Sequence, residues 1–588
     1  MIEGNTPAEI VDRPAGALAV ERRFVQGGVP ERFYTPETTL FENLEIGARR
    51  FPEKAAIHFY GRAISYAELL DEAQRLAGYL QHVCGVARGD RVLVFSQNSP
   101  QFIAAYFAIL CANAVVVPVN AMLLEDEVRH IVEDSGAVAA FAASELLGPV
   151  APLVGTTPLR HVVVHSYGDA LPDDETSETS EAADAGFEIP DWVKRRSDGA
   201  ALPPGMTRWS EALARSQAPR PHHSAPDDLC MLPYTSGTTG KPKACMHTHR
   251  TVMVSVAGSQ LWRRSHAESA FLAVAPMFHL LGLQNGINGP IYMGGTIVLL
   301  PRWDRRAAAA MIARHRVTFW AAPPPMLVEF FAQPGLDAYD LGSLNVVVGG
   351  GAAMPESTAR LMLERYGLRL VEGYGLTETA AFLIANPLHA PRAGHLGVPT
   401  YGVEARVVDP VSLEPLPEGE VGEIVVHGAQ VMLGYWNKPE ADRESFFAMD
   451  GKRFFRTGDL ASVDANGYFR MRDRLKRMVN ASGYKVWPAE VEATLHTHPA
   501  ILEACVIAAR DPHRGETVKA VVALKPDAGE VAVDALLAWC RANMANYKAP
   551  RIVEIVEKLP RSATGKIAWR ELQEQEMKAS PGGTTQAT

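Results

Sequence analysis

Residues 234–243 read YTSGTTGKPK and are dense in groups that hold a polyphosphate. Glycines let the backbone approach a ligand, amides and hydroxyls donate hydrogen bonds, and lysines neutralise negative charge. The stretch differs from a Walker A loop, because only two residues separate Gly237 from Gly240 and Pro242 follows Lys241. An apolar run precedes it, and a segment with the pattern of an amphipathic helix follows from about Thr248. The sequence therefore predicts a phosphate-binding loop between a strand and a helix, with a flexible surface loop as the alternative.

Two more positions suit a magnesium nucleotide. Tyr374 follows a predicted strand in the segment GYGLTET and could stack on a purine. Glu378, four residues later, offers the carboxylate oxygen that Mg²⁺ prefers, and Thr235 or Thr238 could add a hydroxyl oxygen. Because ligands of open α/β sheets bind at the carboxyl ends of the strands, we expect these groups to meet at one edge.

Asp459 and Lys566 complete the set of candidate reactive groups. Asp459 ends the tight turn RTGD and suits the two hydroxyls of a ribose, while Lys566 ends PRSATGK and offers one cation. Each has a plainer alternative, since an Asp after Gly is commonly a turn residue and a loop lysine is commonly solvated. The function therefore depends on the whole set.

Composition narrows the class of protein. The 588 residues carry a net charge of −10, which argues against binding nucleic acid through phosphate contacts. The six cysteines form no CxxC pair, which indicates a reducing compartment rather than a disulfide framework. The first residues lack the apolar core of a signal peptide. We expect a cytoplasmic protein; peripheral association with a membrane and a homodimer both stay open.

One run over residues 102–123 is almost uncharged and long enough to span a bilayer. Asn113, Pro118 and Asn120 interrupt it, and Asn98-Ser99-Pro100 before it is a helix-start signal. The pattern favours a buried helix over 101–113 and a strand over 115–119, and no transmembrane segment.

The elements that must position these residues alternate between helices and short apolar strands, which is typical of parallel sheets covered on both faces. From about residue 399 short β-type segments separated by turns follow, and then a compact α+β unit. The predicted fold class is α/β: a large N-terminal domain of two parallel-type sheets, a small β-barrel-like subdomain, and a small mobile α+β C-terminal domain. Predicted helices span 40–50, 66–83, 307–315, 489–496 and 533–544; predicted strands span 55–59, 91–95, 162–165, 270–275, 296–300, 317–321, 344–348, 368–372, 403–408, 422–427, 467–471, 504–509, 519–525 and 552–556.

Taken in order, five motifs resemble those of the adenylate-forming superfamily, most closely bacterial fatty-acyl-CoA ligases. They are YTSGTTGKPK, YGLTET, TGD, DRLKRMVNASGYKVWPAEVE and PRSATGK. The resemblance spans about residues 39–572. It implies an N-terminal arm over 1–36, an AMP-binding domain over 37–472 with an acidic insertion over 167–191, a hinge over 473–476, a C-terminal domain over 477–578 and a disordered tail over 579–588.

The resemblance also implies roles for individual residues. Lys566, Glu378, His279 and Thr235 would be catalytic, with Lys566 serving adenylation, His279 lying near the acyl carboxylate, and Thr235 and Glu378 binding Mg²⁺. Asp473, Arg474, Leu475 and Lys476 would form the hinge, and Ser482, Gly483 and Tyr484 would flank the thioester-forming face. Ala244 stands where Gly is usual, and Asn480 where many relatives have Lys. The nucleotide- and CoA-binding set would be Thr235, Ser236, Gly237, Thr238, Thr239, Gly240, Lys243, Gly350, Gly351, Ala352, Gly373, Tyr374, Gly375, Thr377, Glu378, Asp459, Arg474, Lys476, Asn480, Ser482, Gly483, Tyr484 and Lys566.

The implied reaction joins a carboxylic acid to CoA at the expense of ATP, with Mg²⁺ as cofactor. A carboxylate and ATP would give an acyl-adenylate and pyrophosphate, and the CoA thiol would then displace AMP. A medium- or long-chain fatty acid is the leading substrate, because the segments around His279 and residues 319–331 are strongly apolar. An aryl or other organic acid is the alternative, since an apolar pocket accepts either. A nucleotide-binding regulator without catalysis would be expected to lack Lys566 or Glu378, and both are present.

Overall fold

The computed structural model describes residues 10–11, 33–172, 187–235, 242–350, 354–481, 484–511, 515–526, 528–529, 531–561 and 567–578. Side chains are not described at 10–11, 476, 480–481, 484–485 and 515. The chain divides into two compact units, Met1–Glu404 with Val426–Phe455 and Ala405–Val425 with Arg456–Thr588.

The first unit contains a seven-stranded sheet in the order β11-β10-β6-β5-β7-β8-β9. Its neighbouring strands run parallel except β10 and β11, which run antiparallel. The strands are β5 (Arg91–Phe95), β6 (Val115–Val119), β7 (Ala139–Ala143), β8 (His161–His165), β9 (Met206–Arg208), β10 (Leu229–Met231) and β11 (His247–Thr248).

A nine-stranded sheet follows in the order β18-β17-β16-β15-β14-β12-β13-β3-β4. Its central strands are parallel and its edge strands antiparallel. The strands are β3 (Ala55–Phe59), β4 (Arg62–Ser65), β12 (Ala270–Ala273), β13 (Thr296–Leu299), β14 (Phe319–Ala322), β15 (Val346–Gly350), β16 (Leu370–Tyr374), β17 (Ile384–Ala385) and β18 (Val398–Pro399). One hydrophobic core includes residues of both sheets, among them Val92 and Trp320. The predicted parallel-sheet architecture is confirmed.

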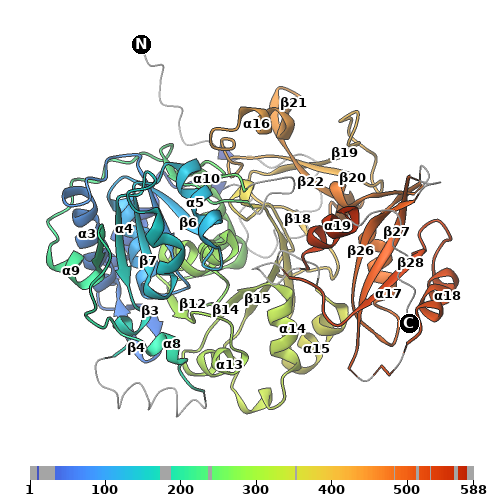
Figure 1. Ribbon diagram of the computed structural model, residues 1–588, viewed down its shortest axis with the longest axis horizontal. Coiled ribbons are helices and arrows are strands. Elements are labelled where there is room, and N and C mark those ends of the chain that lie inside the picture. The colour runs from blue at the N-terminus through green and yellow to red at the C-terminus, as the bar shows by residue number, and fades with distance from the viewer. Residues whose placement is uncertain are drawn as a thin grey trace. The chain divides into compact units, whose positions relative to one another are not determined.

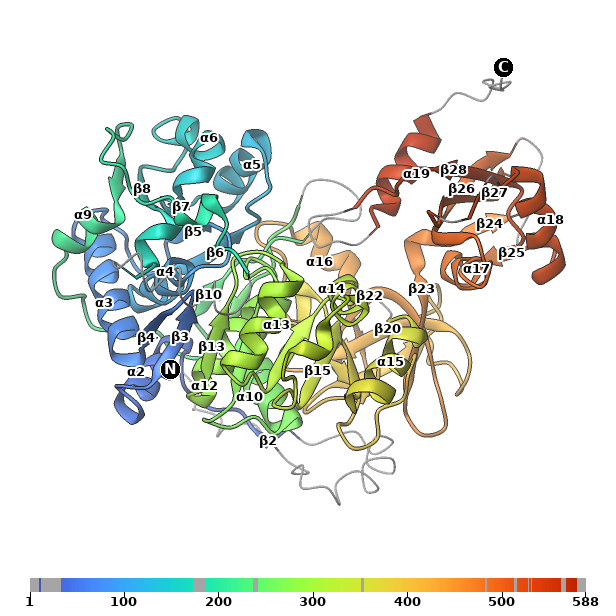
Figure 2. The ribbon, with the colours of Figure 1, turned by 90° about the horizontal axis from the view of Figure 1, so that it is seen from below.

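Helices fill the connections between the strands, and Figure 1 shows α3 and α4 beside the strands that include β6 and β7. In Figure 2 α13 and α14 lie near β13 and β15. The longer helices of the first unit are α2 (Leu40–Arg50), α3 (Tyr66–His82), α4 (Pro100–Cys111), α5 (Glu125–Ser135), α10 (His249–Arg263), α13 (Arg305–Arg314), α14 (Pro324–Ala332) and α15 (Glu356–Tyr366); the shorter ones are α6 (Leu147–Val150), α8 (Asp191–Lys194), α9 (Trp209–Ala214), α11 (Leu280–Leu283), α12 (Gly289–Met293) and α16 (Pro439–Ser445).

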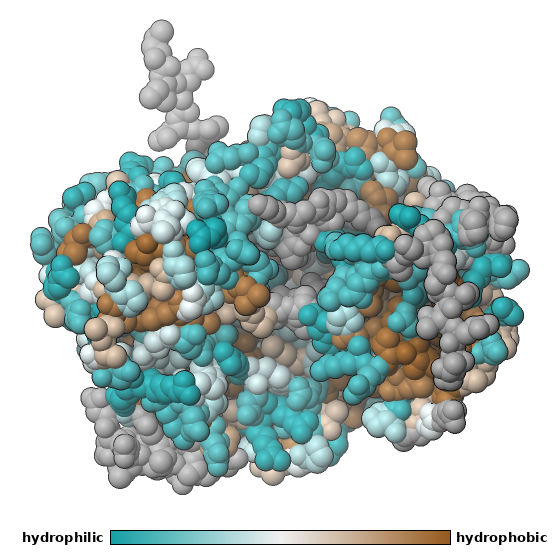
Figure 3. Space-filling model, viewed as in Figure 1, coloured by the Kyte–Doolittle hydropathy of each residue, from teal (hydrophilic) through white to brown (hydrophobic). Residues whose placement is uncertain are grey.

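The nearly uncharged run forms α4 and β6, as predicted. Every residue of α4 is buried, the Ser99 hydroxyl accepts a hydrogen bond from the Phe102 amide, and Pro100 occupies the first turn. None of the helices in the described ranges has the length and hydropathy needed to cross a bilayer. Hydrophilic residues cover most of the coloured surface on the face shown in Figure 3.

Helix α10 begins at His249, close to the predicted start, with Thr248 as its N-cap. The amphipathic character that we expected is wrong, because 13 of its 15 residues are buried. Its polar side chains are accommodated by buried hydrogen bonds; the Ser255 hydroxyl, for example, donates to the carbonyl of Ala380 at 2.5 Å.

The predicted barrel-like or antiparallel segment forms a five-stranded sheet in the order β19-β20-β22-β21, with β23 beside β22. The division between the two compact units falls within β22. The strands are β19 (Glu404–Val408), β20 (Gly422–His427), β21 (Phe446–Met449), β22 (Lys452–Val463) and β23 (Phe469–Arg474).

The C-terminal part of the second unit is α+β, as expected, with a five-stranded sheet in the order β25-β24-β27-β26 and β28 parallel to β27. Strands β26 and β27 exceed their predicted lengths because their antiparallel pairing runs from Ile501–Leu524 to Asp511–Gly515. The elements are β24 (Val479–Ala481), β25 (Tyr484–Val486), α17 (Pro488–Leu495), β26 (Ile501–Asp511), β27 (Gly515–Leu524), α18 (Val533–Asn543), β28 (Ile552–Val556) and α19 (Trp569–Lys578).

Candidate active site

The ends of the predicted phosphate-binding loop are paired with each other. Tyr234 and Ala244 form an antiparallel bridge, and the Thr235 amide donates to the carbonyl of Lys243 at 2.8 Å. We predicted a loop between a strand and a helix; the two-residue strand β11 lies between the end of this loop and α10. Five loop residues of the predicted set lie outside the described residues: Ser236, Gly237, Thr238, Thr239 and Gly240.

Asp134, near the end of α5, holds the base of this loop. The Tyr234 hydroxyl donates to Oδ2 of Asp134 at 2.9 Å, and Nζ of Lys438 lies 2.7 Å from Oδ1. The indole N–H of Trp436 donates to the backbone carbonyl of Asp134 at 3.1 Å. One carboxylate thus fixes where the loop leaves the sheet, and no local pattern in the sequence marked it.

Tyr435 joins two of the predicted site residues. Its hydroxyl donates to Oε1 of Glu378 at 2.9 Å, and Nζ of Lys243 lies 4.6 Å from the centre of its ring. Its backbone is held as well, since the Tyr435 amide donates to Oδ1 of Asp442 at 2.8 Å. Burial and the neighbouring Glu378 carboxylate raise the pKa of Tyr435 well above its usual value, so the hydroxyl keeps its proton and donates. The structure therefore brings Lys243 and Glu378 to one side chain that the sequence analysis missed.

The turn that carries Glu378 is fixed by its neighbours. The Met432 amide donates to the carbonyl of Glu378 at 2.8 Å, and Nε2 of His247 donates to the carbonyl of Thr377 at 2.7 Å. Burial lowers the pKa of His247 to about 4, so its ring is neutral near pH 7. A Cβ on Gly375 would lie 1.8 Å from the carbonyl oxygen of Ala381, so only glycine fits there.

The residues predicted to contact the carboxylic acid substrate and the adenine ring lie at the carboxyl ends of the strands of the nine-stranded sheet. Gly350 ends β15, Gly373 and Tyr374 end β16, and His279 precedes α11 as its N-cap. A Cβ on Gly350 would lie 3.5 Å from Cδ1 of Leu281, so α11 packs directly behind that glycine. Gly351 and Ala352 lie outside the described residues.

Asn98 fixes the loop that carries His279. Its Nδ2 donates to the carbonyls of Ala275 and Leu300 at 3.1 and 3.3 Å, and its Oδ1 accepts from the Met277 amide at 2.8 Å. Asn98 follows β5 of the other sheet, so the carboxyl ends of the two sheets are joined here. We had read this asparagine only as part of a helix-start signal.

In the second unit Asp459 and Arg474, both predicted to bind the ribose, form an ion pair. They lie opposite each other on β22 and β23, and Nε of Arg474 is 2.9 Å from Oδ1 of Asp459. The Asp459 amide donates to the Thr457 hydroxyl at 3.1 Å, and that hydroxyl donates to the carbonyl of Ile424 at 2.7 Å. The TGD turn is therefore held by its own threonine.

The remaining predicted residues of the second unit are only partly described. Lys476 lies in a short 3₁₀ turn, and Asn480 and Tyr484 lie in the hairpin of β24 and β25, but their side chains are not described. Ser482, Gly483 and Lys566 lie outside the described residues. The loop that contains Lys566 has paired ends, since Arg561 and Ile567 form an antiparallel bridge.

Asp473, the first residue of the predicted hinge, is buried at the end of β23. Its carboxylate accepts hydrogen bonds from the Ala489 amide at 2.6 Å and from the Arg474 amide at 2.7 Å. Burial raises the pKa of Asp473, and the nearby Arg477 opposes that rise. The start of α17 is thus tied to the hinge segment, and motion about 473–476 stays a prediction.

The donor set present fits Mg²⁺. This ion is commonly held by one or two carboxylates together with phosphate oxygens and water. Glu378 supplies a carboxylate and Thr235 a hydroxyl, and the described residues contain no cluster of three or more His, Cys, Asp or Glu. Such a set suits an ion that is bound largely through the phosphates of ATP.

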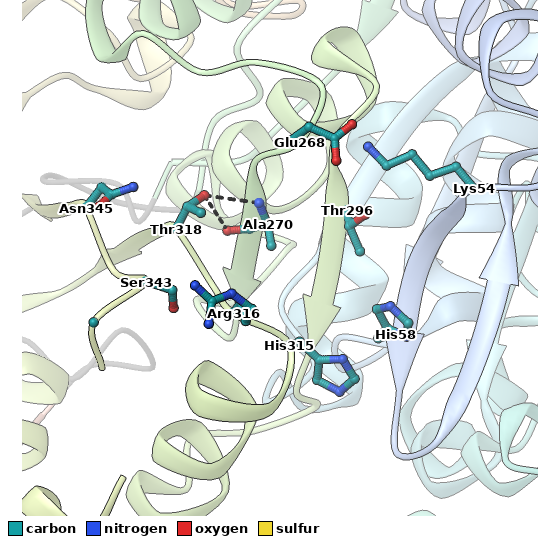
Figure 4. Close-up of a pocket in the computed structure, with 11 residues that line it drawn as sticks. Lys54, His58, Glu268, Ala270, Thr296, His315, Arg316, Thr318, Ser343 and Asn345 are labelled. Carbon is teal, nitrogen blue, oxygen red and sulfur yellow. Dashed lines mark hydrogen bonds between the residues drawn. The ribbon is translucent and has the colours of Figure 1, made fainter. Parts of the chain in front are cut away.

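A cavity of about 540 Å³ lies at the opposite edge of the nine-stranded sheet (Figure 4). Ala270 and Thr296, at the amino ends of β12 and β13, line it, and so do the rings of His58 and His315, which stack at 4.4 Å. Nζ of Lys54 donates to the carbonyl of Gly294 at 2.7 Å. No predicted site residue lines this cavity, so the candidate site is the carboxyl edge.

Two family models match most of the chain, one described as AMP-binding enzyme over residues 44–436 and the other as AMP-binding enzyme C-terminal domain over residues 490–566. A long-chain-fatty-acid–CoA ligase of Bacillus subtilis (strain 168) is 34% identical over 553 residues, which cover 93% of this chain and 96% of that protein. A feruloyl-CoA synthase of an Amycolatopsis species is 36% identical over 522 residues, covering 88% and 95%. The crystal structure of ATP-bound MatB from Rhodopseudomonas palustris superposes with a TM-score of 0.78 at 27% identity, covering 92% and 99%.

These matches agree with the fold. The chain belongs to the AMP-binding enzyme family and is an adenylate-forming acyl-CoA synthetase. The resemblance found in the sequence motifs is thereby confirmed at the level of the family.

Proposed function

We propose that this enzyme is an ATP-dependent ligase that joins medium- or long-chain fatty acids to CoA. The observation that carries the reaction is the placement of Lys243 and Glu378 on either side of Tyr435. This arrangement gathers a cation for phosphate and a carboxylate for a metal ion at one place. The Bacillus subtilis relative supports an alkyl substrate, and the apolar cluster around Phe271, against which Leu281 packs, is compatible with one.

In the first step a carboxylate oxygen of the acid attacks the α-phosphorus of ATP, and the bond to the bridging oxygen of pyrophosphate breaks. The loop that ends at Lys243 would hold the β- and γ-phosphates, Thr377 would meet the α-phosphate, and Lys566 would neutralise charge on the reacting phosphate. Mg²⁺, bound by Glu378 and Thr235, would offset the charge of the triphosphate.

Tyr374, Gly350, Gly351 and Ala352 are proposed to line the adenine and the acyl end of the pocket, with Gly373 and Gly375 beside Tyr374. Asp459 and Arg474 would bind the ribose. His279 would lie beside the acid carboxylate. In the second step the CoA thiol attacks the acyl carbon, loses its proton and displaces AMP as the leaving group. The segment that carries Asn480, Ser482, Gly483 and Tyr484 would flank the path of pantetheine after motion at 473–476. Lys476 is the remaining residue of the proposed nucleotide- and CoA-binding set.

An aryl acid is the second candidate substrate. The feruloyl-CoA synthase supports it, because that relative matches at an identity close to that of the fatty-acid ligase. An apolar wall accepts either an alkyl chain or an aromatic ring, so the wall does not discriminate between the two classes.

A substrate panel tests this proposal. The purified enzyme is incubated with ATP, Mg²⁺, CoA and single acids, namely alkanoates of increasing length, benzoate and cinnamate, and the release of pyrophosphate and AMP is followed. We expect equal release of both products and the highest kcat/KM with medium or long alkanoates. Preference for an aryl acid supports the second candidate, and absence of turnover with every acid overturns the ligase proposal.

A further inference from the structure

Arg263, the last residue of α10, is a buried cation without an anionic partner. It is 9% exposed, and no carboxylate within the described parts of the chain forms an ion pair with it. Burial lowers the pKa of Arg263 to about 10, which still leaves the guanidinium charged near pH 7. A buried charge without a counter-charge is costly, so its retention calls for a reason beyond packing.

Among the described residues, the guanidinium has one hydrogen-bond partner and two aromatic neighbours. Nη1 of Arg263 donates to Oδ1 of Asn285, and Cζ lies 5.1 Å from the centre of the Phe319 ring and 5.4 Å from that of Phe382. A guanidinium has five N–H donors, and neither aromatic face accepts a conventional hydrogen bond. Most of its donor capacity therefore remains for a ligand.

A short chain of contacts connects Arg263 to the proposed acid pocket. A Cβ on Gly350 would lie 3.5 Å from Leu281, which follows His279 by two residues. The carbonyl of Leu281 accepts a hydrogen bond at 2.7 Å from Nδ2 of Asn285, whose Oδ1 accepts from Arg263. Leu281 also packs against the cluster that contains Phe319. Arg263 is thus linked through the single side chain of Asn285 to Leu281, which packs against Gly350.

We propose that Arg263 determines substrate specificity by binding an oxygen atom at the distal end of the acid. The preferred acids would carry a carboxylate, hydroxyl or phenol oxygen far from the reacting carboxylate. This inference rests on the proposed function, and it applies to alkyl and aryl acids alike. A site built to hydrogen-bond a substrate oxygen rejects analogues without it, because its own donors are then left unsatisfied.

The experiment compares acids of equal length with and without the distal oxygen. Alkanoates are compared with ω-hydroxyalkanoates and α,ω-dicarboxylates, and cinnamate with its para-hydroxy derivative, by kcat/KM for pyrophosphate release. We expect about a tenfold or larger preference for the oxygen-bearing member of at least one pair. The alkyl pairs and the aryl pair show separately whether the preferred acid with a distal oxygen is aliphatic or aromatic. A wild-type ratio of one or less in every pair overturns the inference.

Two variants connect this preference to the side chain. Arg263→Met removes the hydrogen-bond donors and keeps a long apolar side chain. The ratio of kcat/KM for the oxygen-bearing acid to that for its analogue should therefore fall towards one. Arg263→Lys should retain part of the preference. Arg264→Met, at the adjacent exposed arginine, should leave the ratio unchanged. If Arg263 only stabilises the fold, Arg263→Met lowers the melting temperature and slows all acids equally, and the inference fails. If Arg263→Met does not fold, the inference is tested by the kcat/KM ratios of the wild type and by whether Arg263→Lys lowers them.

The two proposals fail in distinguishable ways. Turnover of several acids with no preference for a distal oxygen overturns only the role of Arg263. Absence of pyrophosphate release with every acid overturns the ligase proposal and this inference together.

Discussion

Tyr435 shows at the residue scale how one hydroxyl can organise a site. It donates to Glu378 while its ring faces the cation of Lys243, so the proposed phosphate-binding group and the proposed metal ligand share one support. A carboxylate held by a hydrogen bond keeps its orientation towards a metal ion, because partners of the metal ligands fix the geometry of those ligands. Tyr435 is therefore a positioning residue for Glu378.

Tyr435→Phe should raise the Mg²⁺ concentration needed for half-maximal adenylation by roughly tenfold. Loss of a hydrogen bond to a charged group costs about 1.5 kcal/mol, and the phenyl ring keeps its contact with Lys243. The measurement is a Mg²⁺ titration of pyrophosphate exchange, together with Mn²⁺ binding followed by electron paramagnetic resonance.

Tyr79→Phe is the matched control, because it removes a phenol that donates to Thr207 at 3.0 Å. Its Mg²⁺ titration should match that of the wild type. An unchanged titration for Tyr435→Phe would remove Tyr435 from the metal site.

At the scale of the elements, α5 anchors the phosphate-binding loop through Asp134. This carboxylate joins the helix to Tyr234 at the start of the loop and to Lys438 before α16. A glycine-rich loop has large conformational entropy, so fixing its ends reduces the entropy that is lost when ATP binds.

Asp134→Ala should raise the KM for ATP several-fold and lower the free energy of unfolding by about 1–2 kcal/mol. The effect is moderate because the Lys438 partner is partly exposed to solvent. Steady-state kinetics and thermal unfolding measure the two effects. Glu133→Ala, at an exposed position of the same helix, should change neither quantity. Equal effects of the two substitutions would show that Asp134 has no special role.

For the whole molecule, the proposed reaction imposes two different demands on one site. Adenylation brings a carboxylate to a triphosphate and needs added positive charge, whereas thioester formation needs a path for the CoA thiol. A C-terminal domain that swings about the predicted hinge, residues 473–476, would meet these demands in turn.

Lys566→Ala should slow formation of the acyl-adenylate about a hundredfold or more, while a supplied acyl-adenylate is still converted to the thioester at close to the wild-type rate. Single-turnover measurements of each half-reaction provide the test. Lys558→Ala, an exposed lysine on the same unit, should leave both rates unchanged. Equal loss of both half-reactions in Lys566→Ala would contradict a division of the two steps between two positions of the predicted C-terminal domain.

The sequence by itself determined the types of chemistry and most of the local structure. Helix α2 and strands β20 and β28 begin and end at the predicted residues, because periodicity, capping and turn signals act over a few neighbouring positions. The order of the five motifs was enough to identify the family. Glycines, hydroxyls and lysines within one loop also predict a phosphate site, since all of them lie within ten residues.

Only the tertiary structure decided which side chains support those motifs. Asn98 and Ala275 are 177 residues apart, and Tyr435 and Glu378 are 57 apart, so no local pattern connects them. Arg263 ends a helix as any basic residue can, and only its packing between two aromatic rings shows that it is buried. Long-range contacts depend on how the sheets and helices pack against one another, and a single sequence records the residues but not that packing.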